Sequence, residues 1–95
     1  MNKLTIAMIS DVFHDRNAKA TLLKRLKEAK ESGAQLAVLP EIACNPWSPS
    51  SKVLKKDDAE VLGGPRCKMQ SACAKEVGIG IVGAAILNNN GARYN

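Results

Sequence analysis

The chain has 95 residues, close to the usual size of one domain, and carries a net charge of +5. No apolar stretch approaches the length of a membrane span or resembles a signal peptide, so we expect a cytoplasmic protein with no membrane partner. Its basic side chains are mixed with acidic ones and only Phe13, Trp47 and Tyr94 are aromatic, which argues against a nucleic-acid partner.

The cysteines Cys44, Cys67 and Cys73 are odd in number and show no close pairing motif. This pattern indicates reduced thiols rather than a framework of disulfides. His14 is the single histidine, and the usual zinc-ligand spacings are absent. We therefore expect neither a metal site nor a cofactor.

In chain order, the first half predicts a strand, a helix and a second strand. Residues 3–10 contain four apolar residues with only small residues between them, which favours a strand. Residues 18–32 repeat apolar side chains at spacings of three and four, as one face of a helix does, and Gly33 supplies a left-handed residue to end it. The apolar run from Leu36 to Leu39 predicts a strand over residues 35–39 that is buried on both faces. The tight joins imply a βαβ unit with parallel strands.

Glu41 lies just beyond this second strand, because Pro40 has no N–H to give to a neighbouring strand and ends it. Ligands of open α/β sheets bind at the carboxyl ends of the strands. A carboxylate held there by a rigid strand is a candidate general base. The alternative is a solvated loop carboxylate, since acidic residues commonly follow strands.

The second half begins with a long irregular stretch, residues 42–63, in which prolines and serines break any periodicity. Gly64-Pro65 then opens a second helix, with proline in a first-turn position where its missing N–H does no harm. Gly78 ends this helix. Its apolar stripe comprises Met69, Cys73 and Val77.

Residues 79–87 predict a third buried strand, and Asn88-Asn89-Asn90-Gly91 predicts a hairpin turn before a return strand. Residues 78–83 match the dinucleotide pattern G-x-G-x-x-G, but they follow a helix instead of opening one, so we reject a nucleotide site. A return strand at the end of the sequence leaves an unpaired edge, and two helices are few to cover both faces of a parallel sheet. We therefore expect the chain to be the first part of a longer protein.

Several short segments together resemble the carbon–nitrogen hydrolase (nitrilase) superfamily. They are Leu39-Pro40-Glu41 after Gly33-Ala34, Gly63-Gly64-Pro65, Ala74-Lys75-Glu76-Val77-Gly78, Ile81-Val82-Gly83 and Arg93-Tyr94-Asn95. The resemblance covers essentially the whole chain. It implies an α/β fold in which residues 1–95 form the N-terminal β-α-β-α-β part of a single hydrolase domain, an incomplete nitrilase-like α-β-β-α sandwich.

In that superfamily a Glu-Lys-Cys triad hydrolyses non-peptide carbon–nitrogen bonds of amides, nitriles or carbamoyl compounds. The glutamate is the general base, the cysteine the nucleophile, and the lysine stabilises the oxyanion. Glu41 matches the catalytic glutamate, whereas the family's lysine and cysteine lie further along than this sequence extends. Lys68 and Lys75 are no substitutes, because both fall within the second predicted helix. The resemblance thus implies a small-molecule substrate and a homo-oligomer for the full-length protein, and an inactive 95-residue chain.

By the same resemblance, Trp47 and Asn45 belong to one wall of the substrate pocket, although a tryptophan here could equally cap the core. Two other functions stay open. The chain could be a non-catalytic α/β module that binds a partner through its open sheet edge. It could also be a redox-responsive protein that uses Cys67, because a helix N-terminus beside Arg66 favours a thiolate, although a free cysteine is more often an inert packing residue.

Overall fold

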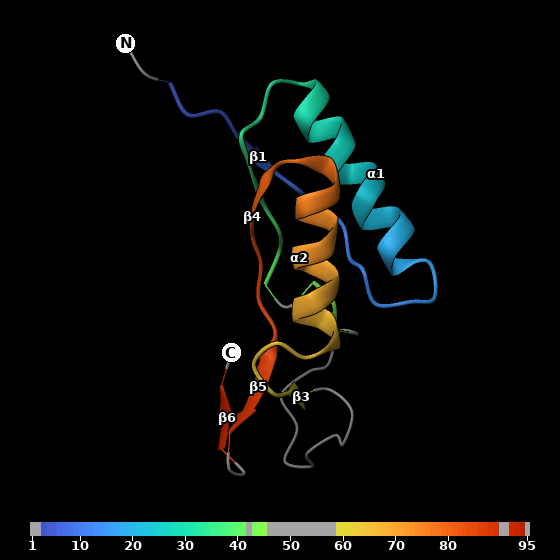
Figure 1. Ribbon diagram of the computed structural model, residues 1–95, viewed down its shortest axis with the longest axis vertical. Helices are drawn as coiled ribbons and strands as arrows, with labels where there is room; N and C mark the ends of the chain where they lie inside the picture. The colour runs from blue at the N-terminus through green and yellow to red at the C-terminus, as the bar shows by residue number, and fades with distance from the viewer. Residues whose placement is uncertain (1–2, 42, 46–58, 90–91, 95) are drawn as a thin grey trace.

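The computed structural model describes residues 3–41, 43–45, 59–89 and 92–94 (Figure 1). Its helices are α1 (Ala18–Glu31) and α2 (Pro65–Val77), and its strands are β1 (Ile6–Met8), β2 (Leu36–Val38), β3 (Ala59–Glu60), β4 (Gly80–Val82), β5 (Ile86–Asn89) and β6 (Ala92–Tyr94). The predicted α/β class is confirmed. No helix among these residues has both the length and the apolar character needed to cross a lipid bilayer.

The first sheet has the strand order β1-β2-β4, and both strand pairs in it are parallel. Ala37 in β2 lies opposite Ala7 on one side and Ile81 on the other, so β2 is the central strand. This confirms the predicted parallel pairing of residues 3–10 with residues 35–39, although the observed strands are shorter. The βαβ connection through α1 produces this arrangement, because a helical crossover returns the chain in the same direction.

Both helices cover the same face of this sheet (Figure 1). The chain steps in one direction from β1 to β2 to β4, and right-handed crossovers in one direction place their helices on one side. Ala7, Ala37 and Ile81 face that side and contact the core. Because side chains alternate along a strand, the neighbours Ile6, Met8 and Val82 face the other side, where they are 47%, 77% and 50% exposed.

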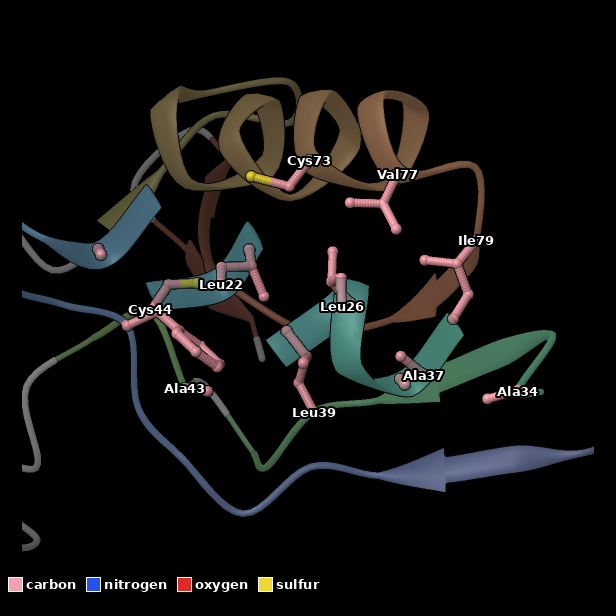
Figure 2. Close-up of a cluster of buried hydrophobic side chains, with 13 residues drawn as sticks. Leu22, Leu26, Ala34, Ala37, Leu39, Ala43, Cys44, Cys73, Val77 and Ile79 are labelled. Atoms are coloured by element: carbon pink, nitrogen blue, oxygen red, sulfur yellow. The ribbon is translucent and has the colours of Figure 1, made fainter. Parts of the chain in front are cut away.

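The core lies between the helices and the covered face of the sheet (Figure 2). Leu22 and Leu26 of α1 are both 0% exposed, and full burial of one leucine stabilises a fold by roughly 1.5–3 kcal/mol. The buried stripe of α1 is the predicted one: Ala18, Leu22, Leu26 and Ala29. The helix packs through this stripe, while Lys19, Lys24 and Lys27 are exposed.

The second helix has the predicted boundaries, and its buried face includes an unexpected polar residue. Pro65 occupies its first turn, and Gly78 ends it with a φ of 77°, in the left-handed region that favours glycine. Its buried residues are Gln70, Cys73 and Val77. The predicted apolar stripe of Met69, Cys73 and Val77 faces the core, where Met69 is partly buried and packs against the cluster, and Gln70 is buried beside it.

The prediction of one continuous strand over residues 79–87 was also wrong. Two strands replace it: β4 pairs with β2, and β5 belongs to a second sheet of order β3-β5-β6. The last bond between β2 and the β4 segment runs from the Leu39 N–H to the Val82 carbonyl at 2.9 Å, and Pro40 follows with no N–H to donate. Beyond that point, the Ala84 carbonyl accepts a hydrogen bond from Gln70 Nε2 at 3.3 Å.

The second sheet contains one confirmed and one unexpected feature. In β5 and β6, Asn89 lies opposite Ala92 in antiparallel pairing, which confirms the predicted hairpin and return strand. Asn88 and Asn89, which were predicted in the turn, belong to β5, and residues 90–91 lie outside the described residues. Residues 42–63 were expected to be irregular, but β3 lies within them and pairs in parallel with β5. Strand pairing with a distant partner explains β3, which has no apolar alternation of its own.

Candidate active site

Glu41 follows the central strand of the parallel sheet. The ladder extends one residue past β2, because the Leu39 N–H still donates to Val82, and Pro40 ends it. Glu41 then lies in the turn beyond the carboxyl end of the strand, at the place where the sequence predicts it, and it is exposed.

The chain returns to the core directly after this turn. Ala43 and Cys44 are buried within the hydrophobic core, and Asn45 is 4% exposed. The Phe13 N–H donates to the Ala43 carbonyl at 2.7 Å, which ties this loop to the segment that follows β1. The segments that follow β1 and β2 are thus joined just beyond the sheet.

Of the two residues predicted to line a substrate pocket, the structure describes only Asn45. Trp47 lies outside the described residues. Asn45 is described and buried, whereas Glu41 is exposed, so the two residues differ in their access to solvent. A substrate pocket shared by Glu41, Asn45 and Trp47 stays a prediction.

Cys44 is the thiol closest in sequence to Glu41. Burial raises the pKa of Cys44 to about 11, although the Arg66 guanidinium partly offsets this effect. Burial also raises the pKa of Cys73. Both thiols therefore stay protonated near neutral pH, and a protonated thiol is a poor nucleophile. All three cysteines of the chain are free, and Cys67 is the least buried of them.

A second carboxylate, which our sequence analysis did not single out, binds the start of α2. Glu60 accepts the N–H of Arg66 at 3.1 Å and the N–H of Cys67 at 3.0 Å, one on each carboxylate oxygen. These N–H groups in the first turn have no partner within the helix, and the helix dipole favours a negative charge there. The sequence signal was an acidic residue a few positions before a helix that begins with Pro65.

The charge of Glu60 is maintained despite its burial. Its side chain is only 4% exposed. Burial by itself raises the pKa of Glu60, but the hydrogen bonds from Cys67 and Arg66 together outweigh it, so the pKa lies below its ordinary value. The carboxylate is thus ionised at neutral pH, and the Arg66 guanidinium lies 3.4 Å from it.

Arg66 connects this carboxylate to the loop after Glu41. Its Nε donates to the carbonyl of Cys44 at 3.3 Å, while Nη1 binds Glu60. A cavity of about 530 Å³ borders this contact, and its described lining includes Phe13 and His14 but not Glu41. The structure therefore holds two carboxylates in different settings: an exposed one at the sheet end and a buried one at the helix start.

Within the described ranges, no group of three or more His, Cys, Asp or Glu side chains is arranged to hold a metal ion. The chemistry available at the sheet end is that of the Glu41 carboxylate itself, which can accept a proton from a neighbouring group. Comparison of the sequence with protein-family models and with curated proteins gave no match.

Proposed function

We propose that this chain supplies the general base, Glu41, of a hydrolase that cleaves non-peptide carbon–nitrogen bonds in amides, nitriles or carbamoyl compounds. One observation carries the proposal: Glu41 lies directly beyond the carboxyl end of β2, the central strand of a parallel sheet. Ligands of α/β sheets bind at that end. Glu41 is exposed at this end of the sheet.

In the proposed reaction, Glu41 takes the proton of a cysteine thiol, and the thiolate attacks the carbonyl carbon of an amide. A lysine ammonium stabilises the oxygen as it becomes negative. The C–N bond then breaks, the amine leaves with the proton that Glu41 returns, and a thioester remains. Water hydrolyses the thioester, releasing the acid and restoring the thiol. In this proposal the lysine and the cysteine come from parts of the protein outside residues 1–95.

The thiols and lysines within the chain support that assignment. Cys44 is close to Glu41 in sequence, but its pKa of about 11 keeps it protonated. Lys68 and Lys75 are both exposed residues of α2, on the helix-covered side of the sheet. None of these residues combines a reactive form with a place at the carboxyl end of β2.

The proposal extends to the fold. Ile6, Met8 and Val82 form an exposed apolar surface on the face of the sheet that the helices do not cover. Parallel sheets are normally covered on both faces, and two sheets pack face to face through such side chains. We propose that a second sheet packs here and completes an α-β-β-α sandwich.

The same apolar face favours one alternative function. A non-catalytic module would bind a partner chain through this surface, because large exposed apolar patches mark interaction sites. The alternative needs no role for Glu41. Activity measurements on Glu41 variants therefore separate the two functions.

The experiment is single-turnover thioester formation in the full-length protein with a simple amide substrate. Glu41→Gln keeps the shape of the side chain but removes its basicity, so we expect at least a roughly hundredfold loss of rate with an unchanged melting curve. Glu41→Asp should also be slow, because the shorter side chain withdraws the carboxylate from the thiol. Glu76→Gln, at an exposed position of α2, is the matched control and should keep the parent rate.

Two results would contradict the proposal. The first is thioester formation by Glu41→Gln at the parent rate. The second is hydrolysis of an amide or nitrile by the purified 95-residue chain, abolished by Glu41→Gln, because we expect no turnover without the lysine and the cysteine.

A further inference from the structure

The backbone before Glu41 is held from both sides of the central strand. On one side, the Ile9 N–H donates to the Val38 carbonyl at 2.9 Å. On the other side, the Leu39 N–H donates to the Val82 carbonyl, also at 2.9 Å. The chain therefore enters the Glu41 turn from a fixed position.

The backbone after Glu41 is held by two further contacts from different elements. The Phe13 N–H donates to the Ala43 carbonyl at 2.7 Å, from the segment that follows β1. Arg66 Nε donates to the Cys44 carbonyl at 3.3 Å, from the first turn of α2. Glu41 thus lies midway between two fixed stretches of backbone.

Arg66 is itself fixed by Glu60. The guanidinium is planar, so the direction of Nη1 toward Glu60 determines the direction of Nε toward Cys44. The two side chains are only 23% and 4% exposed, which limits screening of the pair by water. The same carboxylate also binds the backbone N–H groups of Arg66 and Cys67. The orientation of the guanidinium is therefore tied to the start of α2.

We infer that Arg66 is a positioning residue for Glu41: with Glu60 it fixes the loop of residues 43–45 and thereby the place of the carboxylate. This inference rests on the proposed function, because it assigns Arg66 an effect on the proton transfer by Glu41. Arg66 has no direct role in the chemistry. Its effect comes from geometry, and a misplacement of about 1 Å in a catalytic group can cost on the order of a hundredfold in rate.

The first measurement is steady-state and single-turnover kinetics of the full-length protein. Arg66→Lys keeps a positive charge beside Glu60. A single ammonium group, however, cannot bind both Glu60 and the Cys44 carbonyl in the fixed directions that the planar guanidinium provides. Arg66→Met removes the charge as well. We expect the acylation rate to fall roughly ten- to hundredfold in Arg66→Met and by less in Arg66→Lys, while KM changes less than about twofold. Lys68→Met, an exposed position of the same helix, is the control and should keep the parent rate.

The second measurement needs no activity. Amide hydrogen exchange reports how firmly the loop is held, because the Phe13 N–H is protected by the Ala43 carbonyl. We expect this amide to exchange at least about tenfold faster in Arg66→Met than in the parent and in Lys68→Met. Amides of α1 should keep their protection in every variant. If Arg66→Met does not fold, Arg66→Lys replaces it in both measurements.

Faster exchange at Phe13 together with slower acylation supports the inference. Parent-like acylation in the Arg66 variants overturns it, whether or not exchange changes, and so does parent-like exchange at Phe13. A parent rate in Glu41→Gln is a separate result. It removes the proposed function, and the exchange measurement then still decides whether Arg66 holds the loop.

Discussion

Lys30 of α1 donates a hydrogen bond from its Nζ to the carbonyl of Val77, the last residue of α2, at 2.8 Å. The last carbonyls of a helix have no partner within it, and together they carry a partial negative charge. A lysine from the neighbouring helix satisfies one of them. The contact ties the two helices together at the end of α2 that leads into β4, and Glu60 binds the opposite end of that helix.

Replacing Lys30 with methionine should destabilise the fold. The substitution keeps most of the apolar stem but leaves the Val77 carbonyl without this donor, so we expect the free energy of unfolding to fall by about 1 kcal/mol. Denaturant titration followed by circular dichroism measures the change. Lys27→Met, at an exposed position of the same helix, should stay within about 0.5 kcal/mol of the parent. Equal stabilities of the two variants would show that the contact contributes nothing.

Glu60 should make the stability depend on acid pH. Its pKa is lowered in the folded state, so its contribution is complete above the ordinary value of 4.5 and is lost as the pH falls through the folded-state value. We expect Glu60→Gln to lose about 1–3 kcal/mol at neutral pH, because the amide has no charge and offers one acceptor oxygen where the carboxylate offers two. The stability difference between parent and variant should shrink below pH 4.5.

The Arg25 side chain also lowers the pKa of Asp11. Because Asp11 is present in both proteins, its contribution to the pH dependence cancels in the stability difference. Urea titrations at a series of pH values give the comparison. A difference that stays constant down to acid pH would mean that Glu60 is not the titrating group.

Gly83 should not tolerate a side chain while Gln70 is present. A Cβ at this position would overlap Gln70 Oε1 and would come within 3.3 Å of Leu39 Cδ1. Gln70 cannot move away freely, because its Nε2 donates to the Arg66 and Ala84 carbonyls at 3.2 and 3.3 Å. We expect Gly83→Ala to cost about 1–3 kcal/mol. In a Gln70→Ala background the cost should be smaller, and a double-mutant cycle tests this.

The cysteines should differ in their rates of alkylation. Burial raises the pKa of Cys44 to about 11 and also raises that of Cys73, so both are protonated and shielded at neutral pH. Cys67 is more accessible. We expect iodoacetamide to label Cys67 first, as read by peptide mass spectrometry, and to label the other two only when the protein is unfolded. Equally fast labelling of Cys44 in the native protein would contradict its burial.

Much of the first sheet could be predicted because its signals lie within a few residues of one another. The spacing of Leu22 and Leu26 is enough to indicate a helix and its buried face. Gly78 marks a helix end through its own backbone preference. Pro40 ends a strand because it lacks an N–H, and this places Glu41 at the carboxyl end of β2 without any knowledge of the fold.

The remaining features depend on residues that are far apart in the chain. Residues 79–87 have the composition of one strand, yet a strand continues only where a partner continues beside it, and pairing with β2 stops after Leu39. Gln70 is a polar residue in a helix; its amide donates to the Arg66 carbonyl one turn earlier and also to the Ala84 carbonyl, a partner that only the fold brings beside it.

The same reason applies to the candidate site. The sequence alone predicts that a carboxylate follows an apolar strand, because the apolar run and Pro40 are consecutive residues. The predicted burial of that strand on both faces was wrong, since Leu36 and Val38 are only partly buried. It contains no local signal that Arg66 reaches the Cys44 carbonyl, 22 positions earlier in the chain. That contact forms when the fold brings the Cys44 carbonyl beside the start of α2, where Glu60 also binds the guanidinium. Tertiary structure therefore decides how the loop after Glu41 is held.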